Sequence, residues 1–150
     1  MTTIDQIKKL RSETSAGVME TKKALEDAGG DTEKAKKLLQ EWGVVKAQKK
    51  TDREAADGLV ATYVHATGKI ASMVELFCET DFVARTPDFQ NLAKELAMQV
   101  AATDPQGSDE LLSQEYIREP SKTVQDLINE VVAKVGENIR VGRFQRFEIG

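Results

Sequence analysis

Cysteine and histidine are nearly absent from this 150-residue sequence, in which Cys78 and His65 are the single examples of their types. One cysteine excludes an intrachain disulfide, and a lone histidine without a cysteine pair makes a poor metal site. Hydrolytic and redox enzymes need converging reactive groups, and the sequence also lacks a glycine-rich loop of the kind that cradles phosphate. We therefore expect no catalytic residues, no metal site and no bound cofactor.

Long apolar runs are missing as well. No stretch approaches the roughly 18 consecutive apolar residues that span a bilayer, and no lipidation signal is visible. The first twenty residues contain only an amphipathic segment, TIDQIKKL, in place of the apolar run of a signal peptide. We expect no membrane role and a cytoplasmic location.

Charge is unevenly distributed along the chain. The net charge of −4 divides into +3 for residues 1–53 and −7 for residues 54–150. An acidic segment repels phosphate backbones, and the basic excess of the first segment is small and mixed with acidic residues. The sequence therefore favours a protein over a nucleic acid as the partner.

Residues 1–53 have the start signals, apolar spacing and stop signals of three short helices. Thr3 and Gln6 have the spacing of a capping box, and a Gly-Gly pair ends the second helix. Asp31 caps the third helix, which we expect to end at Gly43. The residues expected to face the core of this bundle are Ile4, Ile7, Leu10, Val18, Thr21, Leu25, Ala28, Ala35, Leu38, Leu39 and Trp42.

Residues 54–150 begin with a period of two, which predicts a hairpin turning at Thr67-Gly68. Helical spacing follows over residues 87–103 and 121–136, and residues 139–149 read as a last strand with a bulge near Gly142. This order predicts an α+β domain with a three-stranded antiparallel sheet and helices packed on one face. The strand residues expected on the buried face are Ile70, Ser72, Val74, Leu76 and Cys78.

The segment CETDFVARTPDF, at the end of the second strand, combines an acidic residue with a large aromatic one. Thr80 or Asp81 could cap a helical turn while Phe82 and Val83 fold back onto the core. Alternatively, Phe82 beside Asp81 could protrude into a pocket of a partner, as hot-spot residues do. The residue pattern leaves both interpretations open.

Three separated segments together resemble one protein family. They are SAGVMETKKALEDAGGDTEKA, ETDFVAR and AKVGENIRVGRF, in this order along the chain. Three signatures in sequence are more specific than one, and the chain resembles the elongation factor Ts family over nearly its whole length. The resemblance implies a ubiquitin-associated-like three-helix domain with linker, residues 1–53, followed by a core dimerisation domain, residues 54–150.

The resemblance also implies a function. Members of this family are guanine nucleotide exchange factors that bind elongation factor Tu, both GDP-bound and nucleotide-free, and they act by binding rather than by bond chemistry. A core loop inserts its Asp-Phe near the partner's magnesium and switch region; the matching residues here are Asp81 and Phe82, with Thr80 and Val83 beside them. The candidates for contact with Tu in the helical domain are Leu10, Val18, Met19 and Lys22.

The sequence departs from the common family pattern at several positions. Ser15 stands for a glycine, and Glu20-Thr21 stands for Asp-Cys. The chain ends after one core subdomain, as in short members of the family, which are thought to dimerise through the core, so we expect a homodimer. Gln145 replaces a cysteine that some short members carry, so we expect no intersubunit disulfide there.

Two other functions remain open from the residues alone. A ubiquitin-associated-type module would bind ubiquitin through the first ~50 residues alone. A plain oligomerising scaffold would need only the open sheet, and its activity would not depend on Phe82.

Overall fold

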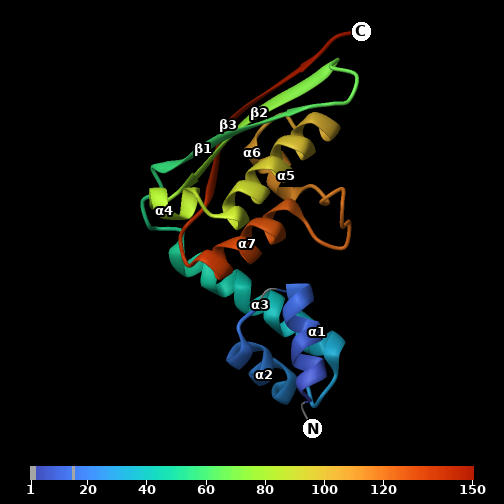
Figure 1. Ribbon diagram of the computed structural model, residues 1–150, viewed down its shortest axis with the longest axis vertical. Helices are drawn as coiled ribbons and strands as arrows, with labels where there is room; N and C mark the ends of the chain where they lie inside the picture. Colours follow the sequence, from blue (N-terminus) through green and yellow to red (C-terminus); the bar gives the residue numbers. More distant parts are fainter. Residues whose placement is uncertain (1–2, 15) are drawn as a thin grey trace.

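The computed structural model describes residues 3–14 and 16–150, and for residues 44 and 46–50 it describes the backbone alone. The chain forms a small helical bundle followed by an α+β domain, as Figure 1 shows with the bundle at the bottom and the sheet at the top. The predicted fold class is confirmed. Ser15, where the sequence departs from the family pattern, lies outside the described residues.

The bundle consists of α1 (Ile4–Thr14), α2 (Val18–Asp27) and the first part of α3 (Thr32–Lys50). The predicted capping box is confirmed, because the Thr3 and Gln6 side chains each accept a hydrogen bond from the other's backbone N–H, at 3.2 and 3.1 Å. Its fully buried apolar residues are few, and they are Leu10, Ala24, Leu25, Ala35 and Leu39.

Three predictions for the bundle are wrong. Ile4, expected in the core, is 71% exposed, because it is the first residue of α1 and the buried residue of that helix is Leu10. Val18 is 47% exposed, because the buried residues of α2 begin one turn later, at Thr21. The third helix does not end at Gly43 but continues to Lys50. The segment after Gly43 is rich in lysine, alanine and glutamine, which favour helix, and α3 packs against α7 (Val124–Val135) of the second domain.

The sheet consists of β1 (Asp57–Val64), β2 (Ile70–Cys78) and β3 (Arg140–Glu148), with β2 in the centre and both pairings antiparallel. The register between β2 and β3 shifts between Val74 and Leu76, which confirms the predicted bulge. The predicted inward face of β2 is also confirmed, with Ser72, Val74, Leu76 and Cys78 buried and Ile70 half-buried.

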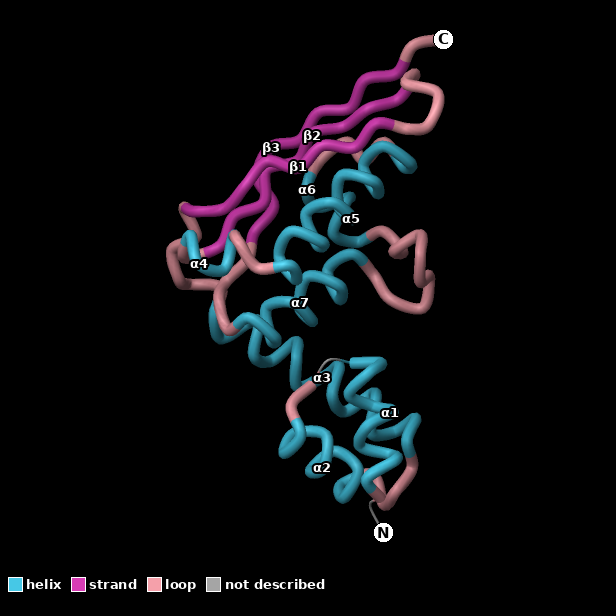
Figure 2. Tube along the Cα trace, viewed as in Figure 1, coloured by secondary structure: helices cyan, strands magenta, loops and turns pink. Residues whose placement is uncertain are grey.

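Helices cover one face of this sheet, as Figure 2 shows. They are α5 (Pro87–Thr103) and α6 (Ser108–Ser113), with α7 packed against both of them, while the single turn α4 (Asp81–Ala84) follows β2 directly. The predicted bounds of α5 are confirmed, with Thr86 as the cap and Pro87 in the first turn. None of the helices described is long and apolar enough to cross a membrane.

Among the residues that the structure describes, no helix covers the other face of the sheet, which carries apolar side chains. One cross-strand row contains Val64, Ala71 and Phe147, and the next contains Thr62, Met73 and Gln145. Val64, Met73 and Phe147 are each more than half exposed, at 64, 51 and 67%. Continuous exposed apolar surface of this kind is typical of a face that meets another protein surface.

Candidate functional site

The candidate site is the tip formed by Thr80 and α4 at the end of β2. Figure 1 places α4 at the end of the sheet that is nearer the helical bundle. Thr80 is the N-cap residue, and its hydroxyl accepts a hydrogen bond from the Val83 N–H at 3.3 Å. The predicted cap is therefore present, and it starts a helix of four residues.

The side chains of this turn point in opposite directions. Val83 is 5% exposed and belongs to the main hydrophobic core, whereas Phe82 is 81% exposed. Burying a phenylalanine side chain is worth about 1.5–3 kcal/mol, so an aromatic ring left in water is available for contact with another molecule. The first interpretation is right for Thr80 and Val83 but wrong for Phe82, which does not fold back onto the core. The exposure of Phe82 is what the second interpretation requires, and contact with a partner stays a prediction.

Asp81 lies next to Phe82 on the exposed side. Its carboxylate is 2.8 Å from the Arg85 guanidinium, one helical turn along the chain, and both side chains are largely exposed. Exposed pairs of this spacing contribute only about 0.3–0.5 kcal/mol, so Arg85 does not prevent Asp81 from engaging a different cation or donor.

Glu137 contacts the tip from a distant part of the chain, and sequence reasoning did not single it out. One of its carboxylate oxygens, Oε1, accepts hydrogen bonds from the backbone N–H groups of Glu79 and Thr80, at 3.1 and 3.0 Å. The other oxygen, Oε2, accepts the Thr80 hydroxyl hydrogen at 2.7 Å. Glu137 lies in the AKVGENIRVGRF segment, but periodicity gives no sign that it meets a residue 57 positions away.

Glu79 makes the reciprocal contact. Its carboxylate accepts the Asn138 backbone N–H at 2.6 Å and lies 3.7 Å from the Arg53 guanidinium. The buried Asn138 side chain in turn donates to the backbone oxygen of Arg53 at 2.7 Å. The tip, the turn after α7 and the linker after α3 are therefore joined through polar contacts.

Cys78 and His65 occupy ordinary structural positions. The Cys78 thiol is fully buried, and burial raises its pKa to about 11, which makes it a poor nucleophile. His65 is exposed and lies near the hairpin turn, 3.2 Å from the Tyr63 hydroxyl. Within the described part of the chain, no group of three or more His, Cys, Asp or Glu side chains could hold a metal ion.

The helical-domain candidates separate into exposed and buried residues. Met19 is 76% exposed, Val18 is 47% exposed and Lys22 is also exposed, so these three form one surface at the start of α2. Leu10 is 1% exposed and lies in the bundle core. A direct contact of Leu10 with a partner is therefore not available in this conformation.

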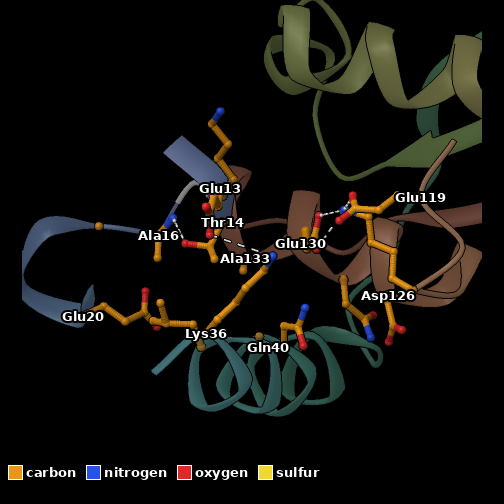
Figure 3. A pocket seen from close by; sticks show the side chains of 16 residues that line it. Glu13, Thr14, Ala16, Glu20, Lys36, Gln40, Glu119, Asp126, Glu130 and Ala133 are labelled. Carbon is orange, nitrogen blue, oxygen red and sulfur yellow. Dashed lines mark hydrogen bonds and ion pairs between the residues drawn. The ribbon is translucent and has the colours of Figure 1, made fainter. Parts of the chain in front are cut away.

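A cavity of about 380 Å³ lies between the bundle and α7, and Figure 3 shows its charged side chains. Lys122 points toward Glu119 and Glu130, at 2.9 and 3.0 Å, and Lys36 lies 3.9 Å from Glu13. Burial opposes the charge of Lys122, but its bonds to the two glutamates outweigh that effect and raise its pKa. We assign this cavity to polar packing between the two domains.

Comparison with known proteins agrees with the three signature segments. The family model described as Elongation factor TS matches residues 79–150, which contain the tip and Glu137. The chain is 39% identical to Elongation factor Ts of Herpetosiphon aurantiacus over 192 aligned positions, covering 98% of this chain and 97% of that protein. It is 42% identical to Elongation factor Ts of Thermoanaerobacter sp., covering 100% of this chain and 96% of that relative.

A longer relative aligns with this chain over a span that does not exceed the chain's own length. Elongation factor Ts of Clostridium kluyveri is 45% identical over 149 residues, which are 99% of this chain and 49% of that protein. The alignment with the Herpetosiphon protein is longer than this chain, so that relative contains segments without a counterpart here. The identity extends over nearly the whole chain in each case, and the chain therefore belongs to the elongation factor Ts family.

Proposed function

We propose that this chain is a guanine nucleotide exchange factor for elongation factor Tu, and that it promotes GDP release by inserting Asp81 and Phe82 near the partner's magnesium and switch region. Family membership supports the partner and the activity. The observation that carries the insertion mechanism is the 81% exposure of Phe82 on a turn that is capped and anchored beneath it.

The proposed mechanism is thermodynamic linkage and involves no bond chemistry. An inserted tip that fits only a distorted nucleotide pocket weakens GDP binding by the same factor by which GDP weakens binding of the tip. Each ~1.4 kcal/mol of this coupling changes the affinity for nucleotide tenfold. Phe82 is suited to this role because an aromatic side chain buries a large area with only two rotatable side-chain bonds.

The surface of Val18, Met19 and Lys22 is proposed as a second contact, on the nucleotide-binding domain of Tu. Its exposed methionine and valine give apolar area, and the lysine adds a positive charge at the margin. Leu10, the fourth contact candidate, lies in the core of the bundle that carries this surface. A cytoplasmic location, where translation takes place, is part of the same proposal.

We also propose that two copies of the chain associate through the open sheet face. Val64, Met73 and Phe147 provide the exposed apolar area, and Gln145 lies in the same row as Met73. Charge introduced at the centre of this face by Met73→Glu should dissociate the dimer, as measured by sedimentation velocity, while Phe82→Ala should leave the mass unchanged. A monomeric wild-type chain would contradict dimerisation without affecting the exchange proposal.

Stopped-flow release of a fluorescent GDP analogue from Tu tests the proposed activity. The intact chain should accelerate release, and Phe82→Ala should reduce the acceleration at least about tenfold, as expected for a hot-spot residue. Ile117→Ala is the matched control, because Ile117 is also exposed, at 42%, but lies in the loop before α7. No acceleration by the folded wild-type chain would exclude exchange activity and leave an interaction scaffold.

A further inference from the structure

We infer that Glu137 is a positioning residue for the tip: its carboxylate fixes Thr80 so that the first turn of α4 presents Asp81 and Phe82 outward. This inference rests on the proposed exchange function, to which it adds a residue outside the partner-binding turn. Glu137 itself belongs to the turn between α7 and β3, and its carboxylate contacts the tip at Thr80.

The α4 turn cannot hold its own geometry. It has four residues, and a helix of that length is far below the 12 to 15 residues at which an isolated helix becomes even marginally stable. Burial of Val83 and Ala84 holds the C-terminal half of the turn, whereas Asp81 and Phe82, in its N-terminal half, are exposed. The direction of Phe82 therefore depends on how the N-terminal end of the turn is held.

Glu137 holds that end with both of its oxygens. Oε1 accepts the Glu79 and Thr80 N–H groups, which fixes the backbone as it leaves β2. Oε2 takes the single hydroxyl hydrogen of Thr80, so the lone pairs of that hydroxyl remain for the Val83 N–H. The Glu137 carboxylate thus holds the Thr80 hydroxyl, and that hydroxyl in turn caps α4. Hydrogen bonds to an ionised acceptor are roughly twice as strong as neutral ones.

The contact is reciprocal, which restricts the two segments further. Glu79 accepts the backbone N–H of Asn138, the residue after Glu137. Asn138 is 7% exposed and donates to the backbone of Arg53, so the linker is part of the same assembly. A turn ordered before binding loses less conformational entropy when it inserts, and a faster productive insertion follows.

Removing the carboxylate should slow GDP release even though Glu137 is not part of the proposed partner-binding turn. Glu137→Ala should lower the maximal stopped-flow release rate about tenfold, equivalent to ~1.4 kcal/mol. Glu137→Gln should lie between this variant and the wild type, because its amide oxygen can still accept both N–H groups while its NH₂ group cannot accept the Thr80 hydrogen. Glu54→Ala removes an exposed carboxylate from the linker, and Tu should release GDP as fast with this variant as with the wild-type chain.

A double-mutant cycle separates positioning from a general structural effect. In the Phe82→Ala background, Glu137→Ala should change the release rate less than about twofold, because it acts through the side chain already removed. An equally large effect in both backgrounds would overturn the positioning role. Wild-type activity of a folded Glu137→Ala chain would overturn it too.

Thr80 provides a second route to the same answer if Glu137→Ala folds poorly. Thr80→Val keeps the shape of the side chain but lacks the hydroxyl, and it should reproduce the Glu137→Ala defect. A wild-type release rate with a folded Thr80→Val chain would contradict the chain of contacts.

Hydrogen exchange of the chain alone distinguishes failure of this inference from failure of the exchange function. The Glu79 and Thr80 amides should exchange at least about tenfold faster in Glu137→Ala, with the amides of α5 unchanged. Unchanged exchange at these two amides would overturn the positioning role whatever Tu does. Absence of acceleration by the wild-type chain, with the amide effect present, would instead exclude the exchange function and leave Glu137 as the residue that orders the tip.

Discussion

The two domains of this chain differ greatly in the size of their cores. Five fully buried apolar residues form the core of the bundle in the described part of the chain, whereas seventeen form the core between the sheet and its helices. In a domain of about 45 residues, the hydrophobic core rarely contributes more than 3–5 kcal/mol to the free energy of unfolding. The comparison indicates that the tip is attached to the more stable domain, and that the bundle depends on a few leucines and its capping residues.

Each domain carries a natural reporter that occurs once in the chain. Trp42 packs against the bundle core, with the Lys23 ammonium 5.6 Å from its ring centroid. Cys78 is fully buried beneath the sheet. Tryptophan fluorescence therefore follows unfolding of the bundle, and thiol labelling follows opening of the α+β domain.

The largest effect is expected from Gly58→Ala in β1. Gly58 has φ +141°, and a Cβ there would lie 2.1 Å from the Leu76 carbonyl oxygen, so the strand backbone must move. We expect a loss of at least ~3 kcal/mol, measured by urea unfolding and by faster Cys78 labelling. Gly142→Ala is the comparison and should cost less, because its φ is not positive and the atom nearest to its Cβ belongs to the Phe77 side chain rather than to backbone. A similar loss in both variants would contradict this account.

Leu25→Ala should break the bundle while the other domain stays folded. Leu25 is fully buried, and truncation of a buried leucine costs about 2–5 kcal/mol, which is comparable to the whole stability expected for so small a core. Trp42 fluorescence should shift to that of a solvated indole, with Cys78 still protected. The exposed Met19→Ala should stay within about 0.5 kcal/mol of wild type. Simultaneous loss of both signals would show that the two domains unfold as one unit.

The two capping boxes allow a like-for-like comparison between the domains. Thr123 caps α7 with Asp126, in a half-buried setting, and Thr3 caps α1 with Gln6 at the surface. Thr123→Ala should cost about 1 kcal/mol and Thr3→Ala about 0.5 kcal/mol, as measured by urea midpoints with the reporter of each domain. The reverse order would indicate that the bundle terminus is more constrained than its exposure suggests.

The smallest expected effect concerns acid. Hydrogen bonds from Arg143 lower the pKa of Glu75 to about 2, so this carboxyl contributes stability above its ordinary pKa of about 4.3 that is lost as pH falls through about 2. NMR titration should show Glu75 ionised at pH 3, and Arg143→Ala should return its pKa toward the ordinary range. If Arg143→Ala left the Glu75 pKa unchanged, the cause of the shift would be a backbone hydrogen bond in the sheet rather than the arginine side chain.

The sequence predicted those features that depend on neighbouring residues. The bounds of α5 follow from Thr86 and Pro87 at its start, and the inward face of β2 follows from strict alternation. It did not predict that α3 passes Gly43, and local periodicity gives no sign that α3 packs on α7, a helix from the other domain. The contact of Glu137 with Thr80 was missed for the same reason, since only the folded chain brings these two turns together.

The continuous α3 helix also determines how the bundle is rotated relative to the second domain. Its 19 residues extend about 28 Å, from the cap of the bundle to the linker whose backbone Asn138 holds. One residue inserted after Gly43 would turn the bundle by about 100° about the helix axis relative to the tip, whereas four inserted residues would turn it about 40° past one full turn. After the one-residue insertion, the surface of Val18 and Met19 would face a different direction, although the structure of either domain by itself would be unchanged.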